Sequence, residues 1–153
     1  MIRLSKQTDY GIVLLTRFVD SGAKSTFAAR ALADTTGIPL PTVSKVLKLL
    51  VREDVLVSQR GARGGYSLAR NPADISVVDI IYALEGGVGL TECVWSPGEC
   101  EHEVTCRVGA NWQIINDAVV GALRRISLLD MSGPLPHELM PLSVGVFTAP
   151  PSS

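Results

Sequence analysis

The strongest constraint on the fold is a short turn, Gly37-Ile38-Pro39, which separates two amphipathic helical patterns. The pattern before the turn, at 27–36, places its apolar residues on one helix face, and Gly37 stands where a helix commonly ends. The pattern after it runs from 40 to about 53 and has Pro41 in its first turn, where proline is tolerated. Two helices joined by such a glycine-containing turn predict a helix-turn-helix.

A β-hairpin is predicted directly after the second of these helices. Residues 55–60 and 66–68 are rich in strand-forming side chains, and the glycine-rich segment 61–65 lies between them. A hairpin in this position is typical of the wing of a winged helix. With further helices predicted at 8–21 and after Ser76, the sequence indicates a mainly α fold with a small β-hairpin wing. We expect this winged helix-turn-helix domain to span residues 1–87.

Charge is distributed unevenly along the chain, although the formal net charge is only −1. Residues 1–70 hold 11 basic and 5 acidic residues, a net charge of +6, whereas residues 71–153 hold 3 and 10, a net charge of −7. A basic half joined to an acidic half suggests that the first half contacts a polyanion such as DNA. A chance distribution of surface charge is the alternative.

The candidate DNA-binding surface combines the second helix of the helix-turn-helix with the hairpin tip. When the apolar stripe of that helix faces inward, four polar side chains lie on or beside its outward face, where they can donate hydrogen bonds to phosphates or base edges. A slim, glycine-rich tip would let two arginines approach the narrow minor groove. A solvated helix face and an ordinary surface turn are the alternatives. The predicted DNA-binding residues are Thr42, Ser44, Lys45, Lys48, Arg60 and Arg63.

The three cysteines lie in a segment without clear periodicity, which predicts a loop over residues 88–107. Their positions, Cys93, Cys100 and Cys106, allow one loop to wrap its thiolates around a single metal centre. A disulfide is disfavoured, because the cytoplasm keeps thiols reduced and an odd number leaves one thiol over. His102 would complete a zinc site of three cysteines and one histidine. The spacing alone does not separate zinc from an iron–sulfur cluster.

A heptad stripe follows the cysteine loop. Its apolar side chains recur at spacings of 4, 3, 4, 3, 4 and 3 residues, which is typical of a helix that pairs with another helix. We therefore expect a dimerisation helix over 108–131 and a homodimer; packing of the stripe on its own winged domain is the alternative. Residues 132–153 hold five of the nine prolines and predict a flexible tail. The stripe consists of Val108, Trp112, Ile115, Val119, Ala122, Ile126 and Leu129.

Membrane proteins and enzymes are the classes that the sequence disfavours. No apolar run approaches the roughly 18–20 residues of a membrane helix, and the N-terminus has no secretory pattern, so we expect a cytoplasmic protein with no membrane partner. The chain has only two histidines, His102 and His137, and no nucleophile motif, phosphate-binding loop or HExxH pattern. An electron-transfer iron–sulfur protein would leave the basic helix-turn-helix and wing unexplained.

The chain resembles the IscR/NsrR family of bacterial winged-helix regulators from residue 1 to about 131. The likeness includes the three-cysteine loop, Asn111-Trp112, and the stretches Leu4–Tyr10, Ile38–Lys45 and Arg60–Arg70. Within the family, Leu90–Cys93, Cys100–Glu103 and Cys106 are most similar to the branch that regulates the SUF iron–sulfur assembly operon. The resemblance implies a homodimeric repressor that binds double-stranded operator DNA and senses iron–sulfur status through a bound 2Fe–2S or 4Fe–4S cluster.

The resemblance also implies that Cys93, Cys100 and Cys106 hold the cluster together with a fourth ligand. The IscR branch carries a histidine three residues after its third cysteine, where this chain has Gly109. The fourth ligand is then either Asp9 of the partner subunit or His102. The alternative for Asp9 is a carboxylate that only favours a helix N-terminus. The alternative for His102 is a solvated loop residue.

Two points limit what the resemblance implies. Ser44 stands where the IscR branch has a glutamate on its reading helix, so the operator sequence does not carry over. The family also contains repressors that sense nitric oxide or redox state. A DNA-binding module whose thiols bind zinc, or react without any cluster, is a further alternative.

Overall fold

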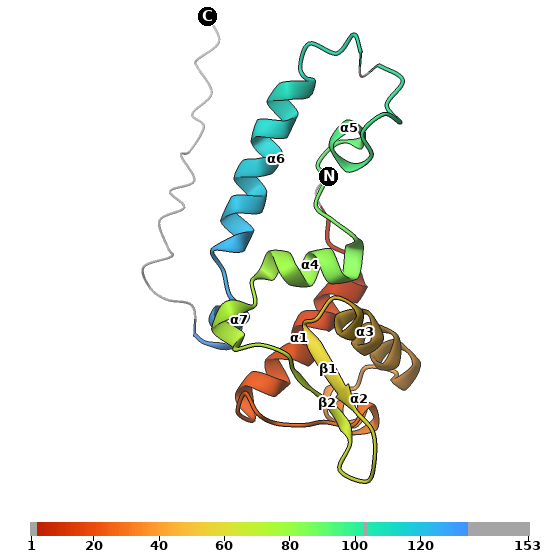
Figure 1. Cartoon of the computed structure of the whole chain (residues 1–153), viewed down its shortest axis with the longest axis vertical. Helices are drawn as coiled ribbons and strands as arrows, with labels where there is room; N and C mark the ends of the chain where they lie inside the picture. The colour runs from red at the N-terminus through yellow and green to blue at the C-terminus, as the bar shows by residue number, and fades with distance from the viewer. Residues whose placement is uncertain (1–2, 103, 135–153) are drawn as a thin grey trace, which may run out of the picture.

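The computed structural model describes residues 3–102 and 104–134, and it is mainly helical with one antiparallel hairpin (Figure 1). This confirms the predicted fold class of a winged helix-turn-helix followed by a long helix. The elements in chain order are α1 (Lys6–Asp20), α2 (Ala29–Thr36), α3 (Leu40–Arg52), β1 (Leu56–Gln59), β2 (Gly65–Leu68), the short 3₁₀ helix η1 (Pro72–Asp74), α4 (Val77–Glu85), α5 (Glu92–Trp95), α6 (Gly109–Arg124) and α7 (Leu128–Ser132).

Several helix ends lie at residues that cap them. Ser5 caps α1, since the Ser5 hydroxyl accepts a hydrogen bond from the Thr8 amide. Gly37 takes a φ of 71° and ends α2 in the left-handed conformation. The capping box that Ser76 and Asp79 predict is present at the start of α4. Local sequence therefore accounts for the start of α1, the end of α2 and the start of α4, whereas α2 and α3 begin without a side-chain cap.

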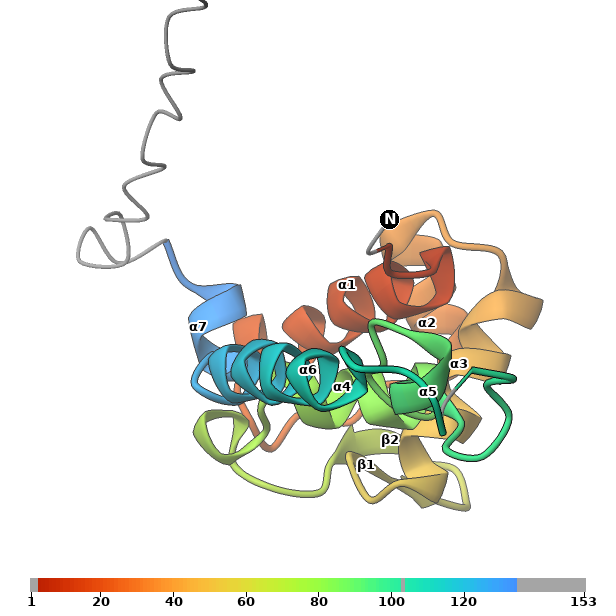
Figure 2. The same ribbon diagram turned by 90° about the horizontal axis from the view of Figure 1, so that it is seen from above.

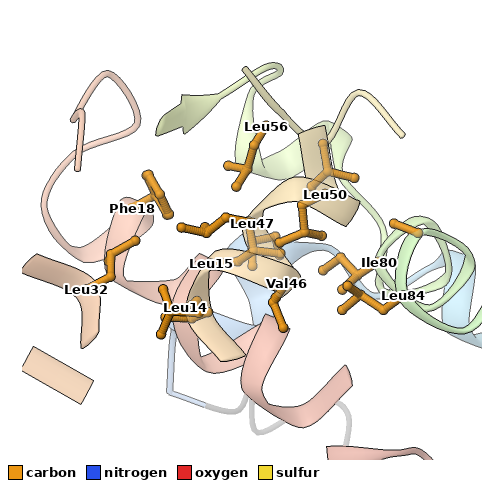
Figure 3. Packing of buried hydrophobic residues seen from close by; sticks show 14 of the residues in the cluster. Leu14, Leu15, Phe18, Leu32, Val46, Leu47, Leu50, Leu56, Ile80 and Leu84 are labelled. Carbon is orange, nitrogen blue, oxygen red and sulfur yellow. The ribbon is translucent and has the colours of Figure 1, made fainter. Parts of the chain in front are cut away.

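One apolar core joins the helices of the winged domain (Figure 3). Helix α1 contacts α3, α4 and α7, and it approaches α4 closely at Gly11, where an added Cβ would overlap the Leu84 side chain. The apolar stripe that the sequence predicts for α3 faces this core. The fully buried apolar residues of α1 and α3 are Leu14, Leu15, Phe18, Val43, Val46, Leu47 and Leu50.

The wing is fixed at its base and exposed at its tip. Strands β1 and β2 pair in antiparallel register from Leu56 with Leu68 to Gln59 with Gly65. Leu56 is fully buried, whereas the rest of β1 is exposed. Phe27, just before α2, exchanges two backbone hydrogen bonds of 2.9 and 2.8 Å with Tyr66. These bonds tie the hairpin to the helix-turn-helix and leave its far end free.

The C-terminal region differs from the prediction in two respects. The expected loop contains the short helix α5, and the helix expected over 108–131 is two helices, α6 and α7. The break occurs because Ser127 and Asp130 form a capping box that starts α7. Leu128 is then fully buried in the winged core, so this core extends beyond the boundary expected at residue 87. Ser132 ends α7, and the rest of the expected tail, from 135 onward, lies outside the described residues.

Backbone hydrogen bonds join the residues at the start of α7 to the residues at the start of α4. The Val77 amide donates to the Ile126 carbonyl (2.8 Å), and the Leu128 amide donates to the Ile75 carbonyl (2.7 Å). Helix α6 contacts α4 and lies over it in the view from above (Figure 2). The wing tip and the cysteine segment lie at opposite ends of the long axis (Figure 1). Within 3–102 and 104–134, no helix has the length and apolar character to cross a membrane.

Candidate functional site

Helix α3 presents polar side chains on the surface beside the wing. Lys45 and Lys48 are exposed, and Thr42 and Ser44 are half-buried. The apolar stripe on the other side of α3 anchors the helix in the core, and α3 also contacts β1. The helix is therefore held firmly while its basic side chains remain available to a partner.

The wing tip is narrow for a steric reason. The Gly64 amide donates to the Gly61 carbonyl (2.9 Å), which closes the turn. A Cβ at Gly64 would overlap the backbone of Gln59 and Arg60, so only glycine fits there. Arg60 and Arg63 are both exposed at this tip. The predicted DNA-binding residues thus lie on two adjacent elements, with four basic side chains exposed; their contact with DNA stays a prediction.

The three cysteines lie in the segment that joins α4 to α6. Cys93, Cys100 and Cys106 are free and half-buried, and the Thr91 hydroxyl lies 3.2 Å from Cys93 Sγ. Within the described residues, no three His, Cys, Asp or Glu side chains converge where a metal ion would bind. Three free thiols on one segment nevertheless fit the donor chemistry of an iron–sulfur or zinc centre. To hold one centre, the segment would have to draw its thiols together.

The two candidates for a fourth ligand lie in different places. Asp9 is exposed in the first turn of α1 and lines a hollow of about 510 Å³ with Arg3, Lys6 and Glu85. His102 is exposed two residues after Cys100, and its carbonyl accepts a hydrogen bond from the Thr105 amide (3.1 Å). The geometry does not choose between them.

Two further residues join separate parts of the fold and were not predicted: Asn116 joins the cysteine segment to α6, and Glu85 joins α4 to the start of α1. Asn116 of α6 is only 5% exposed, and its Oδ1 accepts a hydrogen bond from the Leu90 amide (3.2 Å). Glu85, at the end of α4, accepts hydrogen bonds from the Ser5 amide (3.0 Å) and the Thr8 hydroxyl. No local sequence pattern predicts these hydrogen bonds, because the two residues of each bond are 26 to 80 positions apart.

The electrostatics of Glu85 reflect these contacts. Burial alone would raise the pKa of this carboxyl, but hydrogen bonds from the Ser5 side chain, Thr8 and the Ser5 backbone together lower it below the ordinary value. Glu85 is therefore ionised at neutral pH, and its hydrogen bonds are charge-assisted.

The heptad stripe is largely uncovered by its own chain. The exposed fractions of Val108, Trp112, Ile115 and Leu129 are 50%, 38%, 45% and 48%. Ala122 is exposed as well, and Val119 and Ile126 are half-buried. This exposure disfavours the alternative that the stripe packs on its own winged domain.

Comparisons with known proteins agree with the geometry. A family model described as Rrf2, an iron-dependent transcriptional regulator, matches residues 4–134. Protein rrf2 of Nitratidesulfovibrio vulgaris is 27% identical over 130 residues, which cover 85% of this chain and 87% of that protein. The HTH-type transcriptional regulator IscR of Escherichia coli O1:K1 is 29% identical over 138 residues, covering 82% of this chain and 85% of that protein.

Among solved structures, CymR, the global cysteine regulator of B. subtilis, superposes with a TM-score of 0.67 at 26% identity. The match covers 86% of this chain and 97% of that one. These relatives are regulators rather than enzymes, as the sequence predicted. Since the family model spans most of the chain, the protein belongs to the Rrf2 family of transcriptional regulators, which act by binding DNA.

Proposed function

We propose that the protein is a homodimeric cytoplasmic repressor that binds double-stranded operator DNA through α3 and the wing. Its target would be an iron–sulfur assembly (SUF) operon. The observation that carries the proposal is the placement, on one chain, of an exposed basic surface and of three free thiols at opposite ends of the long axis. This placement would give the chain two distinct sites, one for DNA and one for a signal, as coupling between them requires.

We infer that Cys93, Cys100 and Cys106 hold a 2Fe–2S or 4Fe–4S cluster, with Asp9 of the partner subunit or His102 as fourth ligand. Support comes from the free, half-buried state of the thiols and from the iron-dependent description of the family. When bound, the cluster would supply a centre that responds to iron–sulfur supply. The chain would carry that response through Asn116, which joins the cysteine segment to α6.

The homodimer would use the exposed stripe of α6. At about 1.5 Å per residue, the 16 residues of α6 span about 24 Å. Pairing of two such helices, antiparallel or crossed, would cover apolar surface that a monomer leaves in water. The two copies of α3 would then approach half-sites about one DNA turn, ~34–36 Å, apart on a near-palindrome.

Anaerobic purification followed by an absorption spectrum, iron and sulfide analysis, and operator footprinting tests the proposal. We expect a coloured protein whose cluster-bound form binds its operator about 5–150-fold more tightly than the apo form. Alanine at any of the three cysteines should abolish the cluster and reproduce apo binding without unfolding the winged domain. Equal affinities for cluster-bound, apo and triple-alanine protein, measured at one salt concentration, would overturn the sensing role.

Two observations favour a second candidate, a regulator whose thiols act without a cluster. Within the described residues the cysteines do not converge, and the similar structure of CymR is that of a global cysteine regulator. In this alternative, thiol oxidation would change DNA binding. A zinc centre, like a cluster, would require the thiols to move together. A colourless protein, with or without zinc, whose operator affinity responds to oxidants or nitric oxide would support it over the first candidate.

A further inference from the structure

The start of α1 and the end of α4 are joined by side-chain hydrogen bonds. Glu85, the last residue of α4, accepts hydrogen bonds from the Ser5 amide (3.0 Å) and from the hydroxyl of Thr8, which is fully buried. The Gln7 side-chain amide donates to the Leu84 carbonyl (2.9 Å). Two elements 77 to 80 positions apart therefore meet at one carboxylate.

Glu85 also directly precedes the first residues of the cysteine segment, 86–89, which we call its root. Gly86 ends α4 in the left-handed conformation, and Cys93 follows seven residues later. The α1 side contributes Arg3 and Leu4 to a cavity of about 350 Å³, and the cysteine segment contributes Gly89 and Trp95. Glu85 lines the same cavity, so it lies where the two segments meet.

Helix α5 is held against this root by a close contact. A Cβ on Gly89 would overlap the Cα and Cβ of Trp95, so α5 packs directly on the backbone that leaves α4. Trp95 is two residues after Cys93, and both belong to α5. Ser5 and Thr8 thus contact Glu85, and Gly89 contacts the helix that carries the first cysteine. Residues 86–88 join Glu85 to Gly89, and both residues line one cavity.

We propose that Glu85 is a positioning residue for the cysteine site. It fixes the start of α1 and the root of the cysteine segment as one unit, and thereby sets where Cys93 stands and how Asp9 is presented to the site of the partner subunit. The carboxylate binds no metal itself; it acts through the backbone on either side of it. This inference rests on the proposed cluster function, although its first test does not need a cluster.

The first experiment measures amide hydrogen exchange in the apo protein, with Glu85→Ala, Glu85→Gln and Asp79→Ala as variants. Asp79→Ala is the matched control, because Asp79 accepts a hydrogen bond from the Ser76 amide (3.0 Å) at the opposite end of α4. In Glu85→Ala we expect exchange about tenfold faster in both 5–9 and 86–95, with α3 unchanged. Glu85→Gln keeps an acceptor oxygen and should exchange more slowly than Glu85→Ala in both segments.

The second experiment follows cluster loss to an iron chelator by visible absorbance under anaerobic conditions. Loss of a supporting residue around a metal site commonly weakens binding about 10–100-fold, so the Glu85→Ala protein should lose its cluster faster by a factor in this range. The Glu85→Gln protein should lose its cluster more slowly than the Glu85→Ala protein. The Asp79→Ala protein should keep its cluster, although its fold is less stable than that of the wild type.

The possible failures are distinguishable. A wild-type protein without a cluster would refute the proposed cluster function, while the exchange experiment still decides the role of Glu85. Faster exchange confined to 5–9, or an equal response in Asp79→Ala, would overturn the positioning role. A Glu85→Ala protein that keeps its cluster as long as the wild type would do the same.

Discussion

The winged domain and the segment 87–126 cover their apolar side chains to very different extents. In the winged domain, leucines from α1, α2, α3 and β1 are fully buried by the chain itself. Between 87 and 126, residue 103 aside, only Asn116 is buried, while Ile114 and Trp95 are 67% and 50% exposed. The difference indicates that the winged domain is complete within one chain. The other segment carries surface that a second copy or a bound centre would cover.

The largest expected effect tests whether α7 belongs to the winged core. Leu128 is fully buried and the adjacent Leu129 is 48% exposed, although both belong to α7. Leu128→Ala should lower the free energy of unfolding by about 2–5 kcal/mol, because it leaves a cavity in the winged core. Met131→Ala, at an α7 side chain that is 43% exposed and lies outside the stripe, should change it by less than about 0.5 kcal/mol. Urea denaturation of both variants checks this, and equal losses would contradict the assignment of α7 to the winged core.

The next effect concerns the uncovered stripe of α6. Ile115→Asp places a charge on a side chain that is 45% exposed in one chain, so the fold should persist. If the stripe is the dimer interface, the dissociation constant of the dimer should rise by about 10–100-fold, equivalent to about 1.4–2.8 kcal/mol. Ala110→Asp adds the same charge to α6 outside the stripe and is the control. Sedimentation analysis distinguishes them; an unaltered dimer in Ile115→Asp would exclude this interface.

The same contrast explains what could be predicted from the sequence. The helix-turn-helix and wing depend on local signals, namely apolar periodicity and turn glycines such as Gly37, and these were read correctly. The break before α7 was missed because Ile126 and Leu129 continue the heptad spacing through it. The Ser127–Asp130 capping box was a readable signal, but it was outweighed by that spacing.

The candidate site was less predictable for a different reason. Spacing places three cysteines on one segment, but it does not determine whether their thiols converge. The contacts of Glu85 with Ser5 and Thr8 depend on how α1 packs against α4, which no local pattern encodes. Site geometry that arises from tertiary packing is therefore visible only in the folded chain.

A smaller effect is expected for the predicted DNA-binding side chains, which lie on the stable winged domain. Lys45 and Arg63 are exposed, so replacing either with alanine should change the unfolding free energy by less than about 0.5 kcal/mol. Operator affinity should nevertheless fall by about 1–3 kcal/mol for a base contact, or the salt slope by about one unit for a phosphate contact. Arg125→Ala, an exposed cation at the end of α6, is the control. Unaltered affinity and salt slope in both variants would refute the docking mode.

The smallest effect concerns acid stability at Glu85, where the two regions meet. Burial raises the pKa of this carboxyl, but hydrogen bonds from Ser5 and Thr8 lower it overall below the ordinary 4.5 that the unfolded chain retains. The folded state therefore binds this proton less readily than the unfolded state. The stabilisation is fully present above the unfolded pKa and is lost as the pH falls through the folded pKa.

Glu85→Gln isolates this contribution, because glutamine accepts hydrogen bonds but does not titrate. From pH 7 down to about 5 the stability difference between wild type and variant should be constant, and below about pH 4.5 it should shrink as Glu85 is protonated. Asp130, whose pKa is lowered by hydrogen bonds from the Ser127 side chain and backbone, is present in both proteins, so its contribution cancels. Denaturant unfolding at a series of pH values measures the difference. A difference that stays constant down to pH ~3 would show that the Ser5 and Thr8 hydrogen bonds do not favour the ionised carboxylate, and the contact would then join the two regions without depending on charge.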